Sequence, residues 1–274
     1  LYGSGNITIT GDAVIEESIG GSSGAGAGNS TGGAGIGGGA GGHGTIDISG
    51  NAQVKNALGK DGGAGIGSGH DGDGNVTISG NATIENAEGG KFAAGIGGGS
   101  FGDGTITIKD NAAIGTVTGG SYGAGVGGGA LGVGDVTIEG NVTIKNAQGG
   151  SNAAGIGGGY GAENDEDGNG SGAGKANANI TLEGKVTIVA KAGEGNAAIG
   201  ANGIEQEFTG LAEGSSITRS DSEGNDTTLP TDPVPAVPSA SGGGSADTSV
   251  QESVFPGLVV TDKDGQRISY TSTQ

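Results

Sequence analysis

A unit of 30 residues recurs along most of this chain. The glycines that open successive units are spaced at that interval: Gly44, Gly74, Gly104 and Gly134. Each unit reads approximately G-x-[IV]-x-I-x-[GD]-N-[AV]-x-[IV] and continues into a glycine-rich segment such as AAGIGGG. With a longer first unit that begins at Gly5 and a last unit that begins near Ala178, about six units span residues 3–210. A repeat of this length predicts an array in which each unit stacks on its neighbours.

Apolar and polar residues alternate within each unit. In the segment TIDIS, Ile46 and Ile48 share one face of an extended chain, and Asp47 lies on the other. A second segment repeats this alternation, and a third places one apolar residue among glycines: Ile66, Ile96, Val126 and Ile156. A period of two residues is typical of half-buried strands, whereas glycine at this density disfavours helices.

These patterns predict an all-β fold, a single-stranded parallel β-helix of about six coils. One unit cannot bury its own apolar face, but stacked units can, with residue n beneath residue n+30 and strands about 4.8 Å apart. The general handedness of parallel crossovers favours a right-handed helix. We expect this β-helix domain to occupy residues 1–212.

Composition changes after the repeats. Residues 213–252 are rich in Pro, Gly and Ser and are expected to form a linker. Residues 253–274 return to β character, with a hairpin-like pattern around DKDG. Three alternatives stay open for this tail: it docks on the β-helix, bridges to a neighbouring molecule, or begins a further domain.

One asparagine column is expected at the bend between the first and second strands of the units. Its members are Asn51, Asn81, Asn111 and Asn141. Asparagine tolerates left-handed bends, and stacked amides can hydrogen-bond along a ladder. The sequence therefore predicts a structural ladder at these four positions.

Charge excludes some partners. The net charge is −19, and Arg219 and Arg267 are the only arginines. Binding of nucleic acid requires many cations against the phosphates, so we expect no nucleic-acid partner. No apolar run approaches the roughly 20 residues of a membrane span, so we expect no membrane insertion.

A weak calcium site is the only cofactor site that the sequence suggests. In AENDEDGNG, Glu163, Asp165 and Asp167 alternate as oxygen ligands do in calcium loops. Gly174 stands where such a loop requires a bidentate acid, which favours a solvated acidic insertion instead. We expect no other cofactor.

Four aromatic residues are candidate carbohydrate contacts: Phe92, Tyr122, Phe101 and Tyr160. Phe92 and Tyr122 share one column of the expected stack. Aromatic ladders can receive sugar rings, but they can also shield a bend from solvent, and the second interpretation is favoured.

Catalysis is not expected. The exposed face of the first strands carries one ionisable residue, Asp47, in a row of threonines. Glycoside hydrolysis requires two carboxyl groups within about 10 Å, and no strand face supplies them. Gly33, Gly35 and Gly38 fit a dinucleotide-binding glycine pattern, but the pattern recurs in every unit and no helix follows it.

The string AAGIGGG, followed by GDGTITI, resembles tandem repeats in secreted or wall-attached surface proteins of gut-type Gram-positive bacteria. The resemblance covers residues 3–210 and implies an extracellular β-helical protein without catalytic residues to transfer. We therefore expect a non-catalytic structural or adhesive protein of a bacterial surface, a rigid stalk or adhesin. A carbohydrate-binding module and a self-assembling fibre subunit are the alternatives. The expected partners are host or bacterial glycans, proteins, or further copies of the chain.

Overall fold

The computed structural model describes residues 3–22, 31–161 and 177–234 of the 274-residue chain. Every regular element within them is a β-strand, and these residues contain no helix. The first strands of the first four units are β1 (Gly5–Ile9), β4 (Gly44–Ile48), β7 (Gly74–Ile78) and β10 (Gly104–Asp110). The second strands are β2 (Val14–Ile19), β5 (Gln53–Leu58), β8 (Thr83–Glu88) and β11 (Ala113–Thr118).

In the next two units the first and second strands are continuous, as β13 (Gly134–Gln148) and β15 (Ala178–Lys191). The short third strands are β3 (Ile36–Gly37), β6 (Ile66–Gly67), β9 (Ile96–Gly97), β12 (Val126–Gly127), β14 (Ile156–Gly157) and β16 (Ile199–Ala201). Two further strands follow, β17 (Ile204–Glu205) and β18 (Ser216–Ser220).

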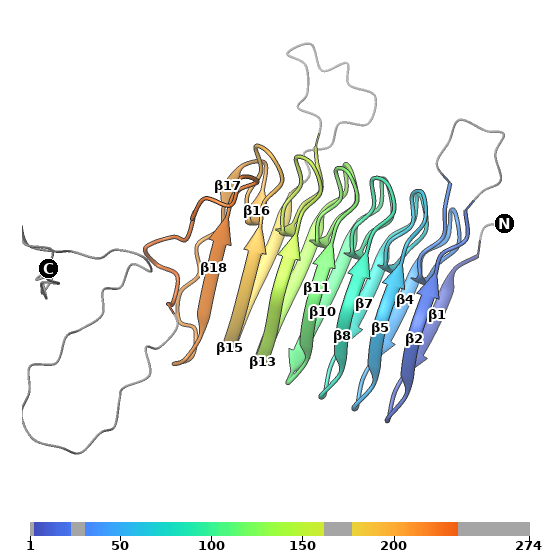
Figure 1. Cartoon of the computed structure of the whole chain (residues 1–274), viewed down its shortest axis with the longest axis horizontal. Coiled ribbons are helices and arrows are strands. Elements are labelled where there is room, and N and C mark those ends of the chain that lie inside the picture. Colours follow the sequence, from blue (N-terminus) through green and yellow to red (C-terminus); the bar gives the residue numbers. More distant parts are fainter. Residues whose placement is uncertain (1–2, 23–30, 162–176, 235–274) are drawn as a thin grey trace, which may run out of the picture. The chain divides into compact units, whose positions relative to one another are not determined.

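Successive units pair through parallel strands in the predicted register. Ile78 of β7 lies between Ile48 of β4 and Ile108 of β10, so residues 30 apart are neighbours. The large sheet has the order β1-β4-β7-β10-β13-β11-β8-β5-β2, with β15 beside β13 and β18 beside β15. Because β13 and β15 each run through both strand positions, this sheet curls into a half-barrel (Figure 1). The prediction of an all-β fold with parallel, stacked units is confirmed.

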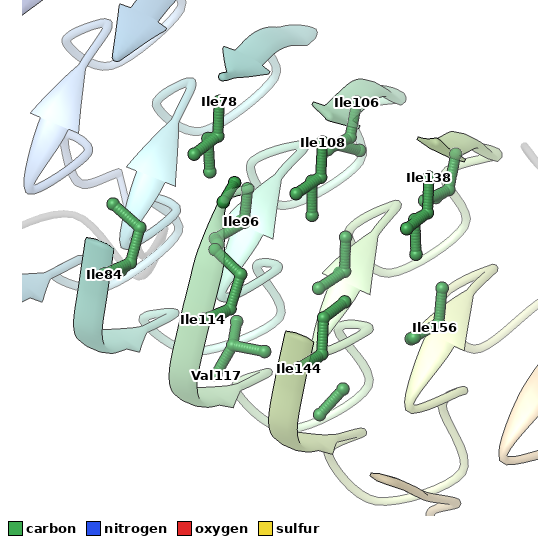
Figure 2. Packing of buried hydrophobic residues seen from close by; sticks show 14 of the residues in the cluster. Ile78, Ile84, Ile96, Ile106, Ile108, Ile114, Val117, Ile138, Ile144 and Ile156 are labelled. Carbon is green, nitrogen blue, oxygen red and sulfur yellow. The ribbon is translucent and has the colours of Figure 1, made fainter. Parts of the chain in front are cut away.

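The third strands form a second sheet, with the order β17-β16-β14-β12-β9-β6-β3. Isoleucines from all three strand positions fill the space between the sheets (Figure 2). In one unit these are Ile78, Ile84 and Ile96, each no more than 1% exposed. Full burial of such a side chain contributes about 1.5–3 kcal/mol. Each therefore stabilises its own unit and the contact with the next.

Glycines allow the two sheets to touch without side chains between them. Gly97 in β9 has a φ of 132°, a conformation that is essentially restricted to glycine. A Cβ atom on Gly104, at the start of β10 in the large sheet, would overlap the carbonyl oxygen of Gly127 in the second sheet. A Cβ atom on Gly97 would overlap the same oxygen from the neighbouring strand of the second sheet. The glycines of the repeat thus serve a close approach of backbones.

The asparagine column forms a continuous series of hydrogen bonds on the surface. The Asn81 amide donates to Asn51 at 3.0 Å, Asn111 donates to Asn81 at 3.3 Å, and Asn141 donates to Asn111 at 3.4 Å. Asn51 in turn donates to Asp12 of the first unit at 2.9 Å. These bonds link five successive units at the bend between their first and second strands.

The compact unit extends past residue 212, the predicted end of the β-helix domain, and includes the last described residues, up to Val234. Within the predicted linker, β18 pairs in parallel with the second half of β15. Ile217 and Arg219 of β18 are buried, so a short strand lies within a stretch whose composition resembles a linker. Residues 235–252 and the predicted tail at 253–274 lie outside the described residues.

Candidate functional site

Three of the four candidate sugar contacts form one aromatic stack at the turns beside the third strands. The rings of Phe92 and Tyr122 are parallel within 8°, with centroids 5.5 Å apart. The ring centroid of Tyr160 lies 5.0 Å from that of Tyr122. The Lys91 ammonium lies 4.8 Å from the Phe92 ring centroid. Because neighbouring groups lie against the rings of Phe92 and Tyr122, this arrangement favours shielding of the turns over stacking on a sugar.

Phe101 is not part of that stack. Its ring lies edge-to-face with His70, with centroids 5.6 Å apart, and the residue is 53% exposed. The His70 Nδ1 atom lies 3.0 Å from the carboxylate of Asp71. The predicted contacts are therefore divided between two groups.

The backbone at these aromatic residues is left-handed. Phe92, Tyr122 and Phe101 have φ values of 69°, 68° and 63°. Residues in such conformations cost about 1–3 kcal/mol each unless glycine, Asn or Asp stands there. In the same columns, Asn152 and Asp71 adopt this conformation at φ 61° and 58°. The turn geometry is thus set by the stack and imposed on the aromatic residues.

Two carboxylates, Asp73 and Asp103, stack in register. The backbone N–H of Asp103 donates to Asp73 Oδ1 at 2.9 Å, and that of Val133 donates to Asp103 Oδ1 at 2.7 Å. Each carboxylate therefore binds the backbone of the next unit. Among the described residues, no group of three or more His, Cys, Asp or Glu side chains is placed to hold a metal ion. The predicted calcium ligands Glu163, Asp165 and Asp167 lie outside the described residues.

A polar groove of ≈ 330 Å³ lies at the carboxyl ends of β11, β13 and β15. Thr118, Gln148 and Lys191 end these strands and are successive register partners. Beside them the groove is lined by the small residues of the adjoining turns, Gly119, Gly149, Gly150, Ser151, Ala192 and Gly193. Glu194 and Ser222 complete the lining.

The groove was not predicted from the sequence. Thr118 and Gln148 are 30 residues apart, but Lys191 follows Gln148 by 43 residues. Earlier in the same strand pair, Ile144 pairs with Ile188, which is 44 residues later. The register therefore shifts by one residue between this pair and the strand end. The insertion and this shift together hide the column from a search at a constant interval.

A buried charge cluster closes the C-terminal end of the described array. The fully buried guanidinium of Arg219 donates to both carboxylate oxygens of Asp232, at 2.7 and 2.8 Å, and to Glu205 at 2.6 Å. It also donates to the backbone oxygens of Ile199 and Gln206. Burial opposes the guanidinium charge, but the hydrogen bonds to Asp232 and Glu205 outweigh it and raise the pKa of Arg219 above its ordinary value. This cluster is structural, since protein groups satisfy its donors.

Asp47, the one ionisable residue on the exposed face of the first strands, lies in β4 between Thr8 and Thr77.

No helix within the described residues is long and apolar enough to cross a membrane. In comparisons with known proteins, no family model, curated protein or solved structure matches the chain.

Proposed function

We propose that this chain is a right-handed, single-stranded parallel β-helix of about six coils that serves as a non-catalytic structural element of a bacterial surface. In this role it is a rigid stalk or adhesin, secreted or attached to the cell wall. The observation that carries the proposal is the unbroken register of parallel strands, in which β1, β4, β7, β10, β13 and β15 follow one another.

Rigidity follows from how the units hold together. Each unit is joined to the next by main-chain hydrogen bonds at three strand positions and by a common isoleucine core. Close glycine contacts between the two sheets, such as Gly104 with Gly127, leave little room for the sheets to slide. A surface lined by threonine, asparagine and acidic residues suits a protein that stays in solvent at high net charge.

The test is single-molecule extension of the whole chain between its termini. A stalk of stacked units should resist force and then lengthen in steps of up to about 100 Å, the contour length of one 30-residue unit. Continuous lengthening at low force would contradict a mechanical role. Protease accessibility on intact bacterial cells that express the full gene would test the surface location separately.

The alternatives make different predictions. A carbohydrate-binding module that uses its aromatic residues should lose sugar binding in Phe101→Ala and Tyr160→Ala, the two exposed members of that set. A self-assembling fibre subunit should appear as filaments in electron micrographs of the purified chain. Isolated particles would favour the structural role.

A further inference from the structure

We propose that the polar groove at the ends of β11, β13 and β15 binds a neutral glycan chain. The groove is at the lower end of the about 300–1,000 Å³ that small-ligand sites occupy. This inference goes beyond the structural role proposed above and does not rest on it, because a stalk needs no ligand.

The lining determines the class of ligand. Apart from Ala192, the side chains of the groove are polar, which disfavours a lipid or an aromatic molecule. Lys191 and Glu194 contribute one charge of each sign, and the chain as a whole is strongly acidic. A polyanion is therefore disfavoured as well, and a hydroxyl-rich neutral molecule fits best.

The side chains that would bind such a molecule are free to form new hydrogen bonds. Among the described residues, the side chains of Gln148, Lys191 and Glu194 form no hydrogen bond or ion pair. Sugar hydroxyl groups both donate and accept, so they complement the amide, the ammonium and the carboxylate at once. The glycines beside these residues add no side chains that would keep a ligand from the backbone.

The backbone argues against a peptide. Peptides that add a strand need unpaired main-chain groups, and other peptides need an apolar pocket. Here the backbone N–H groups of the groove's glycines are already paired. Those of Gly119, Gly149 and Gly193 donate to the backbone oxygens of Gln148, Lys191 and Ala153, respectively. Recognition of a ligand therefore depends on the side chains of the groove, as expected for a glycan.

The groove is also held in shape before any ligand binds. The Asn152 amide donates to the backbone oxygen of Glu194 at 2.8 Å, and the Asn196 amide donates to that of Asn152 at 2.6 Å. These bonds join the turns of neighbouring units on one side of the groove. A site that is preformed loses less entropy on binding.

Affinity gel electrophoresis of the full chain tests the proposal, with β-glucan, galactomannan, glycol chitin and polygalacturonate as probes. We expect retardation by at least one of the neutral polymers and weaker retardation by polygalacturonate. Gln148→Ala and Lys191→Met should each weaken the retardation about tenfold, the effect of one lost hydrogen bond. Gln53→Ala is the matched control, because Gln53 is an exposed glutamine of the same sheet outside the groove, and it should bind as the unmodified chain does.

Four results would overturn the proposal. They are retardation by none of the polymers, equal weakening in Gln53→Ala, binding that depends on Phe101 or Tyr160 but not on Gln148, and stronger retardation by polygalacturonate than by every neutral polymer. Circular dichroism of each variant verifies that it is folded. None of these results bears on force resistance, so the structural role is judged by its own experiment.

Discussion

At the scale of single residues, glycine is required where two backbones touch. Gly97 combines a φ of 132° with a Cβ position that the Gly127 oxygen already occupies. We expect Gly97→Ala to lower the free energy of unfolding by more than about 3 kcal/mol, because neither the dihedral angle nor the contact can relax without parting β9 from its neighbour β12. Gly21→Ala is the control, since nothing lies within 4 Å of its Cβ position, and urea denaturation should show no loss. Equal behaviour of the two variants would contradict a glycine-dependent contact.

Two buried serines differ in whether their hydroxyl groups are used. Ser68 donates to the Gly72 oxygen and accepts from the Gly99 N–H at 2.7 Å, whereas Ser100 Oγ has no hydrogen-bond partner among the residues that the structure describes. An unsatisfied buried hydroxyl is costly, and Ala130 stands at the next position in the Ser100 column. Ser100→Ala should therefore raise the free energy of unfolding by up to about 1 kcal/mol, and Ser68→Ala should lower it by about 1–3 kcal/mol. Thermal denaturation of both variants measures the difference, and a loss of stability in Ser100→Ala would count against an unpaired hydroxyl.

At the scale of elements, β18 depends on the charge cluster around Arg219. Arg219→Met would leave Asp232 fully buried and Glu205 largely buried without their cation. Removal of one partner of a buried ion pair typically costs about 3–5 kcal/mol, and we expect a loss of that size in chemical denaturation. The double variant Arg219→Met/Asp232→Asn should lose less than the sum of its parts, because the groups are coupled. Strict additivity would show that the cluster does not act as a unit.

The turn after β18 should weaken in acid. The Asp221 carboxylate accepts hydrogen bonds from the Asn225 side chain and from the backbone N–H groups of Asn225 and Glu223, and these bonds lower the pKa of Asp221. Because the pKa is lowered in the folded state, the ionised Asp221 carboxylate stabilises the fold fully above the ordinary pKa of 3.8. This stabilisation is lost as the pH falls through the lower pKa of the folded state. Thermal melts between pH 6 and pH 2 should show this acid loss in the unmodified chain. In Asp221→Asn the loss should be smaller, and an identical pH profile would contradict the assignment.

At the scale of the whole array, stability is expected to depend on neighbouring units. Excision of residues 74–103 joins Asp73 to Gly104 and reproduces the junction that Asp103 makes with Gly104. We expect this shortened chain to fold with the same strand-rich circular dichroism per residue and a modestly lower melting temperature, since one interface between units is lost. Excision of residues 74–88 removes the first two strands of the unit and leaves its third, so it should not fold. Equal folding of both deletions would mean that the 30-residue register does not specify the stack.

The sequence predicted the stacked part of the fold well. Between Gly44 and Tyr160 the units have equal length, so the alternation of Ile46 and Ile48 and the interval of 30 residues identify the same inward positions in each unit. It predicted the candidate surfaces less well. Phe92 stacks on Tyr122, whereas Phe101 contacts His70 in a different turn. The 30-residue interval relates residues within one column, and it does not show how far apart two different columns lie.

What the sequence determined by itself is the register, because only the 30-residue offset places the inward apolar residues of each unit on apolar residues of the next and most turn glycines on a glycine. What the tertiary structure alone decided is the closure beyond the repeats and the polar groove. Arg219 meets Glu205 and Asp232 across non-repeating segments, and Gln148 meets Lys191 across an insertion and a shifted register. Such contacts have no period, so they exist only once the chain has brought distant residues together.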